Sequence, residues 1–424
     1  MDKKTLPAIL VGIILITAAV YSIWIFQQEN PNPEKRVFTP ADDTNATAEG
    51  VDQLVESLND FSFEFYKEII ESEEGNVFFS PYSIFVALSM AYEGAGGNTS
   101  DQMQSILNVL QNDSTTLGSF GRLYNLLNQN QDGYTINTAN AFWAHQDYKF
   151  LDEYLGLLQN FYMAEANELD FAKNVEAAEI INSWIEYQTN DKIKDMIDPS
   201  ILSDYTKLVL TNAIYFKGLW SNPFNPDNTY VADFNLATDE TVDVNMMKSD
   251  SENSDYNYTE TDDLKILELP YSGNELSMIL ILPKENNISA AESALDAENL
   301  ASWKVSLFGQ EVDVEIPKFK FEKKYTLNDL LIEMGMVEAF QPGIADLSKM
   351  DGTHDLFISK VLHQSFVEVN EEGTEAAAAT VVTVELTAVL DPIEFIADHP
   401  FVFLIQHKST GAILFMGKVM DPTE

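Results

Sequence analysis

The chain has 424 residues, of which 68 are acidic and 24 basic, so its net charge is −44. This balance argues against nucleic acid as a partner, because binding phosphates requires a positive patch. The chain contains no cysteine, which excludes disulfides, a thiolate nucleophile and cysteine metal ligands. An apolar fraction of 45% still allows a large core.

The N-terminal region contains an uncharged segment at 6–26, preceded by two lysines. As a helix it would extend about 31 Å, close to the roughly 30 Å hydrocarbon core of a bilayer. Lysines before it and none just after it predict an anchor, with residues 1–5 in the cytoplasm and the rest on the extracellular face. A cleaved signal segment and a secreted protein are the alternative, but the bulky residues ending at Phe26 favour retention.

The remaining chain divides into a linker and one large unit. Residues 27–50 are polar, rich in proline, asparagine, aspartate and threonine, and lack periodicity, which predicts a flexible linker. Residues 51–424 contain no further linker and no repeat, and their mixed helical and strand periodicities predict a single α+β unit.

Apolar spacing predicts the elements of this unit in chain order. Helices are expected at 51–69, 84–92, 101–130 (two), 150–165, 175–190 and 327–334. Strands are expected at 76–79, 135–142, 207–216, 229–248, 264–270, 276–283, 313–321, 358–369, 401–405 and 413–419. The acidic run 250–263 is expected to be a solvated surface loop.

The sequence contains no HExxH, CxxC, GxGxxG, GKS/GKT or GxSxG motif, so we predict no catalytic residue, metal or cofactor. His363 and Asn212 lie within apolar strands and need hydrogen-bond partners there. Ser80 and Ser83, at a strand-to-helix junction, are available as partners, so we expect these four side chains to meet. Trp220 is expected to pack rather than to bind a ligand.

The stretch 371–387 combines small residues with β-branched ones and has no aromatic residue. As a strand it would place Thr374, Ala376, Ala378 and Thr380 on one uncharged face. Four consecutive alanines, however, form helices well and strands poorly. The stretch is therefore suited to more than one conformation.

Five strings in this order resemble the serpins, a family of serine protease inhibitors. They are NVFFSPYSI (76–84), LTNAIYFKGLW (210–220), NEEGTEAAAAT (370–380), FIADHPFVFLI (395–405) and ILFMGKVMDP (413–422). The resemblance covers residues 51–424 and implies three β-sheets, eight or nine helices and an exposed reactive loop at about 371–394. It also implies a suicide inhibitor: the protease forms an acyl-enzyme with the loop, and the cut loop inserts into a sheet as a new strand.

The resemblance assigns roles to individual residues. It places the start of insertion at Trp220 and the scissile bond between Thr387 and Ala388, with Leu386, Glu385 and Val389 as alternatives. The loop hinge would comprise small or hydrogen-bonding residues, namely Glu371, Gly373, Thr374, Ala376, Ala377, Ala378 and Ala379. A polar cluster beneath the opening sheet would comprise Ser80, Ser83, Asn212 and His363.

At the positions that would face inward after insertion, Thr374, Ala376, Ala378 and Thr380, the chain has none of the bulky or charged residues common in non-inhibitory relatives, so inhibition is favoured over a binding or structural role. Residues 373–394 contain no arginine or lysine, which predicts elastase-, subtilisin- or chymotrypsin-like targets. The helices at 101–127 lack a basic cluster, so no polyanion cofactor is expected. We expect the chain to be a monomer. Its expected partners are a target serine protease, bound covalently, and a membrane, bound through the N-terminal segment.

Overall fold

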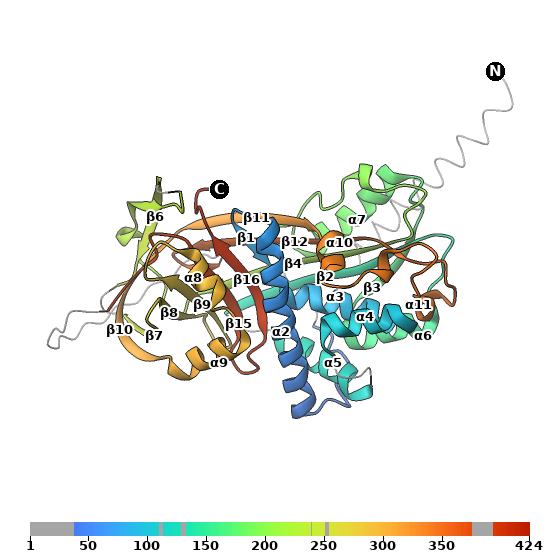
Figure 1. Ribbon diagram of the computed structural model, residues 1–424, viewed down its shortest axis with the longest axis horizontal. Helices are drawn as coiled ribbons and strands as arrows, with labels where there is room; N and C mark the ends of the chain where they lie inside the picture. Colours follow the sequence, from blue (N-terminus) through green and yellow to red (C-terminus); the bar gives the residue numbers. More distant parts are fainter. Residues whose placement is uncertain (1–37, 110–112, 129–132, 239, 251–253, 375–392) are drawn as a thin grey trace, which may run out of the picture. The chain divides into compact units, whose positions relative to one another are not determined.

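The computed structural model describes residues 38–424, apart from 110–112, 129–132, 239, 251–253 and 375–392 (Figure 1). The segment predicted as an anchor, residues 27–37 of the predicted linker and the predicted scissile bond therefore lie outside the described residues. Four predicted hinge residues also lie outside them, namely Ala376, Ala377, Ala378 and Ala379.

The first described helix, α2 (Ala48–Ser72), begins before the predicted boundary at residue 51. The Thr47 side chain caps it by accepting a hydrogen bond from the backbone of Gly50 at 3.0 Å. Before the cap, Ala41 is buried, and its backbone N–H and C=O both bond to the side chain of Asn125. The end of the predicted linker is thus packed against the domain, because its backbone groups find partners there.

A six-stranded sheet carries the candidate site. Its order is β11 (Phe319–Thr326), β12 (Ile358–Asn370), β13 (Gly373–Thr374), β4 (Leu208–Leu219), β2 (Tyr134–His145) and β3 (Glu165–Leu169). Strands β12 and β4 also pair directly and in parallel, from Ile358 opposite Leu208 to Phe366 opposite Tyr215. We call this direct pairing the seam.

Both faces of this sheet are buried, because successive residues of a strand point to opposite sides. Phe142 and Leu210 pack into the large core that includes α3 (Pro81–Glu93). Their neighbours Trp143 and Val209 pack into a second core beneath α7 (Asn174–Gln188). Figure 1 accordingly shows α3 and α7 on opposite sides of the sheet.

The second sheet has ten strands. Its order is β1 (Val77–Phe79), β16 (Ile413–Val419), β15 (Phe401–His407), β9 (Leu276–Pro283), β8 (Leu264–Pro270), β7 (Asp255–Glu260), β10 (Phe308–Pro317), β6 (Thr241–Lys248) and β5 (Tyr230–Asn235), with β14 (Ile393–Ile396) beside β10. The first residues of β10 pair with β7, and the later ones pair with β6 and β14. β10 therefore joins two smaller sheets, which together with the six-stranded sheet correspond to the three that were expected.

Several predicted elements differ from the structure. The strand expected at 229–248 is two antiparallel strands, β5 and β6. The single strand expected at 313–321 is divided, since β10 ends at Pro317 and β11 begins at Phe319 in the other sheet. The acidic run contains strand β7, because Tyr256 and Tyr258 are buried and alternate with polar residues. Period-two burial decides the structure here in spite of the charge.

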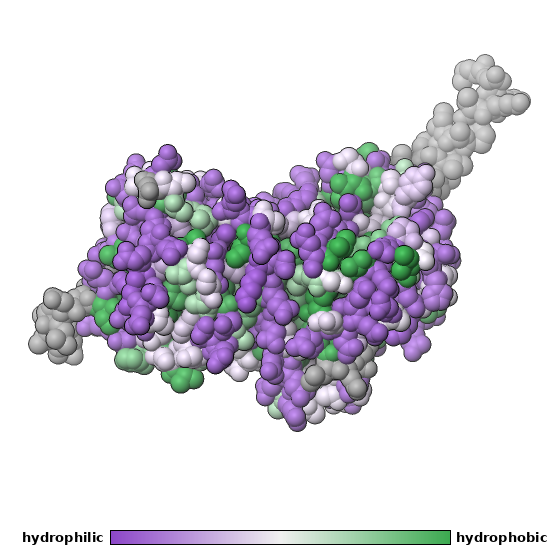
Figure 2. Space-filling model, viewed as in Figure 1, coloured by the Kyte–Doolittle hydropathy of each residue, from purple (hydrophilic) through white to green (hydrophobic). Residues whose placement is uncertain are grey.

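The other helices complete an α+β fold, as predicted. They are α4 (Gly97–Leu107), α5 (Ser114–Asn128), α6 (Asp152–Leu157), α8 (Ile288–Ser293), α9 (Ala297–Ser306), α10 (Asn328–Glu333) and α11 (Ser348–Asp351). The described residues thus contain ten α-helices, α2 to α11, where the resemblance implied eight or nine. On the face drawn in Figure 2, hydrophilic residues predominate and apolar ones form only scattered patches.

The predicted membrane location is contradicted. Among the residues that the structure describes, no helix combines the length and the apolar character needed to cross a membrane. The 25-residue helix α2 is long enough, but it carries several aspartates and glutamates along its length. The segment 6–26, on which the prediction rested, is outside the described residues.

Candidate functional site

The candidate site is the end of the six-stranded sheet where β12 turns back as β13. Gly373 and Thr374 pair antiparallel with Asn370 and Val369 of β12 on one side. On the other side they pair antiparallel with β4. Two residues at the start of the predicted reactive loop are therefore already a strand between β12 and β4, just beyond the seam.

Only glycine fits at position 373. Gly373 has a φ of 150°, a conformation that side chains disfavour, and a Cβ there would lie 2.0 Å from the carbonyl oxygen of Gly218. The predicted hinge glycine thus has a specific structural role in the intact chain: it lets the backbone approach β4 closely.

Thr374 is 1% exposed, and we call its surroundings the Thr374 seat. The seat comprises Gly218, which pairs with Thr374, Tyr271, which hydrogen-bonds to it, and Trp220 and Phe216, which pack on the Tyr271 ring. The hydroxyl groups of Thr374 and Tyr271 are 3.0 Å apart and hydrogen-bonded. The Tyr271 ring stacks on Trp220, with centroids 4.6 Å apart, and meets Phe216 edge-on at 5.1 Å. Burial raises the pKa of Tyr271, so its hydroxyl keeps its proton.

Trp220 lies beside the hinge, at the end of β4. Its indole N–H donates to the carbonyl of Asn370 at 3.0 Å, and its backbone N–H donates to the carbonyl of Glu372 at 2.9 Å. It is 4% exposed. The side chain therefore joins β4 to the turn between β12 and β13.

Glu371 is anchored just before the hinge glycine. Its carboxylate accepts hydrogen bonds from Lys318 and Thr229, each at 2.8 Å, and the residue is only 8% exposed. Burial raises its pKa, but the hydrogen bonds from Lys318, the backbone and Thr229 outweigh burial, so the pKa is lowered overall. The carboxylate is therefore held ionised.

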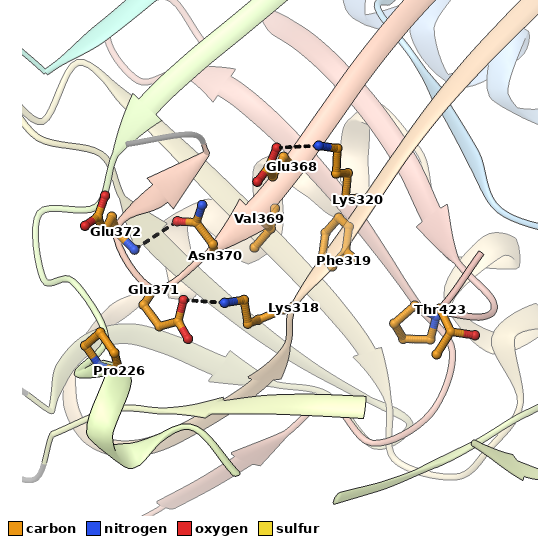
Figure 3. A pocket seen from close by; sticks show the side chains of 11 residues that line it. Pro226, Lys318, Phe319, Lys320, Glu368, Val369, Asn370, Glu371, Glu372 and Thr423 are labelled. Atoms are coloured by element: carbon orange, nitrogen blue, oxygen red, sulfur yellow. Dashed lines mark hydrogen bonds and ion pairs between the residues drawn. The ribbon is translucent and has the colours of Figure 1, made fainter. Parts of the chain in front are cut away.

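Beside this ion pair is an open cavity of about 440 Å³ (Figure 3). A second ion pair, between Lys320 and Glu368 at 3.1 Å, lies on the same side of β11 and β12. The cavity is lined by Pro226, Lys318, Phe319, Lys320, Glu368, Val369, Asn370, Glu371, Glu372, Pro422 and Thr423.

The four predicted polar residues come together across the seam, as expected. His363 of β12 lies opposite Asn212 of β4, and its Nδ1 hydrogen-bonds to the Asn212 side-chain oxygen. The Asn212 amide donates to the hydroxyl of Ser83 and to the side-chain oxygen of Asn140. Ser80 caps α3 by accepting from the backbone of Ser83 at 3.1 Å.

The bonding of His363 indicates a structural role. Its Nε2 accepts the backbone N–H of Ser80 at 3.1 Å, so the ring is neutral and Nδ1 carries the proton. The Ser80 hydroxyl instead donates to the carbonyl of Leu414 at 2.6 Å. Burial lowers the pKa of His363 to about 3, against a small opposing effect of Asn212. These bonds give His363 no serine hydroxyl to deprotonate.

Metal chemistry has no evident location either: among the described residues, no group of three histidine or acidic side chains is arranged to hold a metal ion.

Sequence reasoning missed several residues of the site. Asn140 and Tyr271 were not singled out, although both bond to predicted site residues. The signals that point to them are a polar residue within the strand expected at 135–142 and an aromatic residue directly after the strand expected at 264–270. Neither signal identifies a partner, because partners across strands depend on register.

Comparison with known proteins now places the chain among its relatives. The family described as "Serpin (serine protease inhibitor)" matches residues 56–422. An uncharacterized serpin-like protein of Thermococcus kodakarensis is 40% identical, over 97% of this chain and 99% of that protein. The leukocyte elastase inhibitor of Xenopus tropicalis is 38% identical, over 88% of this chain and 100% of the inhibitor. A crystal structure of human thyroxine-binding globulin matches with a TM-score of 0.80 at 31% identity, over 88% of this chain and 100% of that one.

Proposed function

Because the chain belongs to the serpin family, we propose that it inhibits serine endopeptidases as a suicide substrate. The observation that carries this proposal is β13, which lies antiparallel between β12 and β4 at the mouth of the seam. Its position gives the rest of the reactive loop a direction in which to continue into the sheet. The chain would then act as an inhibitor that is consumed, and not as an enzyme that turns over.

The proposed reaction begins as proteolysis. The protease serine attacks the carbonyl carbon of Thr387, the bond to the nitrogen of Ala388 breaks, and Thr387 remains bound to the serine as an ester. The freed loop then extends β13 between β12 and β4. The protease, attached to the end of the inserting strand, is carried along the sheet and its active site is distorted before water can release it.

The sequence after β13 supports insertion. The buried side chain of Thr374 sets the face, and Ala376, Ala378 and Thr380 would follow on that same face if the strand continued. All are small and uncharged, so burying them leaves no unpaired charge in the sheet.

The polar cluster supports control of this step. The bond between His363 and Asn212 crosses the seam, and Ser80, Ser83 and Asn140 fix the two partners from the α3 side and from β2. Insertion would have to break that bond. We propose that the cluster keeps the seam closed until the loop is cut.

The proposed targets are elastase-, subtilisin- or chymotrypsin-like, because the loop sequence between 373 and 394 has no arginine or lysine. The similarity to leukocyte elastase inhibitor agrees with this class. A non-inhibitory binding role is the second candidate, since the chain is also similar to thyroxine-binding globulin.

The test is incubation of the full chain with elastase, subtilisin and chymotrypsin, with trypsin for comparison. We expect a covalent complex that survives SDS for at least one of the first three, and a released C-terminal peptide that begins at Ala388 by mass spectrometry. Cleaved chain without a complex for all of them would support the binding role instead. Catalytic turnover of a substrate by the chain would contradict both proposals.

A further inference from the structure

In the intact chain Thr374 already lies between β12 and β4, and its side chain has a hydrogen-bond partner there. The Tyr271 hydroxyl is the group that meets the Thr374 side chain, at 3.0 Å. Both residues are buried, so neither hydroxyl can exchange this bond for one to solvent. If Thr374 withdrew, the Tyr271 hydroxyl would lose this partner, and an unpaired buried polar group is costly.

We propose that Tyr271 is a positioning residue that latches Thr374 between β12 and β4 before any cleavage, and so sets how readily the loop inserts. This inference rests on the proposed inhibitory function for its consequence, but the latch itself is a property of the intact chain.

The position of the Tyr271 hydroxyl is fixed from several directions. Its ring is stacked on Trp220, which is itself bonded to the backbone of Asn370 and Glu372. Its backbone N–H donates to Leu276 at 2.9 Å, and its carbonyl accepts from the Ser221 hydroxyl at 2.8 Å. These contacts hold the Tyr271 hydroxyl in place to bond Thr374, so little conformational freedom is lost when the bond forms.

Two glycines make room for the latch. A Cβ at Gly218 would lie 2.7 Å from the Tyr271 ring, and a Cβ at Gly373 would lie 2.0 Å from the Gly218 carbonyl. Since both positions lack a side chain, the Tyr271 ring can lie over β4 while Thr374 lies opposite Gly218. The contact between Tyr271 and Thr374 therefore also depends on glycine at positions 218 and 373, which lie far from Tyr271 in the sequence.

The latch has a kinetic consequence. With Thr374 seated, the register of β13 would carry insertion forward to residue 377, which would separate Phe366 from Tyr215, the last pair of the seam. Without the latch, residues 373 and 374 would first have to enter the sheet. During that delay the acyl-enzyme can be hydrolysed, so more inhibitor would be cut per protease inactivated.

The test uses Tyr271→Phe, which keeps the ring and removes only the hydroxyl. Hydrogen exchange of the peptide containing 371–374 is measured in the intact chain, without protease. We expect exchange about tenfold faster than in the wild type, the effect of losing one hydrogen bond. Thr374→Val, which also removes the hydrogen bond, should give the same increase, whereas Thr374→Ser, which keeps a hydroxyl, should exchange as slowly as the wild type. The double variant Tyr271→Phe with Thr374→Val should exchange no faster than either single variant.

Tyr154→Phe is the matched control, because Tyr154 is also buried and its hydroxyl donates to the Met90 carbonyl at 2.9 Å. It should leave exchange at 371–374 unchanged. Where the wild type forms a complex, the number of inhibitors consumed per protease should rise at least about twofold in Tyr271→Phe and not in the control. Unchanged exchange in both Tyr271→Phe and Thr374→Val would overturn the latch, whatever the chain does to proteases.

Discussion

At the scale of single residues, the imidazole of His363 is kept neutral by its surroundings. Burial lowers its pKa to about 3 from 6.5, so between these values the unfolded chain binds a proton that the folded chain does not. Stability supplied by the neutral ring is therefore fully present above pH 6.5 and is lost as the pH falls toward 3, by at most about 1.4 kcal/mol per pH unit.

We therefore expect His363→Gln to be less stable than the wild type at pH 7.5, by about 1 to 3 kcal/mol, because Ser80 loses its acceptor. The difference should shrink as the pH is lowered to 4.5. Urea unfolding at several pH values measures it, with His354→Gln as control, since His354 is largely exposed. Parallel curves for wild type and His363→Gln would show that the ring does not titrate as inferred.

Sequence reasoning found His363 and Asn212 because each is a polar residue within an apolar strand. The family resemblance then added their roles. Asn140 was not predicted because it lies opposite Asn212 only in the register that β2 and β4 adopt, and no local sequence pattern determines that register. Tyr271 escaped because its bond reaches across more than a hundred residues of sequence.

At the scale of elements, β13 consists of only two residues, so its presence depends on a single backbone conformation. We expect Gly373→Ala to displace β13, because the new Cβ would contact the Gly218 carbonyl and the φ of 150° disfavours a side chain. Exchange at 371–374 should reach the rate of an open loop, while the thermal midpoint falls by no more than a few degrees, about the effect of 1 kcal/mol.

Gly156→Ala in α6 is the control for that substitution, since nothing lies within 4 Å of the added methyl. It should leave both exchange and complex formation unchanged. If Gly373→Ala retained slow exchange at 371–374, the close approach of β13 to β4 would not be what holds the hinge.

Element types were predictable where burial and periodicity agree, as in β4 and β12, whose apolar runs match the expected strands closely. The division at Lys318 was missed because the sequence marks it only by a change of phase, from apolar Val314 and Ile316 to apolar Phe319 and Phe321, where the chain passes from one sheet to the other. Strand β7 was hidden by the acidic residues around its two buried tyrosines.

At the scale of the whole molecule, the net charge of −44 opposes compactness through repulsion among carboxylates. We expect the thermal midpoint to rise by several degrees between about 0.05 and 1 M NaCl, where the screening length falls to about 3 Å. Potassium chloride at the same ionic strength should act alike, because screening does not depend on the cation. A midpoint that fell with either salt would show that attractive ion pairs such as Lys318–Glu371 outweigh the repulsion.

The overall fold was the most predictable feature, because strings spread over the chain identified the family, and each string corresponds to an element of one of the two sheets. The N-terminal prediction failed for the opposite reason. It rested on one segment alone, with no second feature of the chain to check it.

The seam has a consequence for how stability in this molecule should be understood. β12 and β4 are parallel to each other, and β13 is antiparallel to both, so a longer β13 would exchange one parallel ladder for two antiparallel ones, which bond better per residue. The intact fold would then be a long-lived intermediate, kept from its free-energy minimum by the rate at which the seam opens. A substitution that strengthens the seam would raise the melting temperature and also slow the opening of the seam. Among seam variants, those with the highest melting temperature should therefore inhibit most slowly.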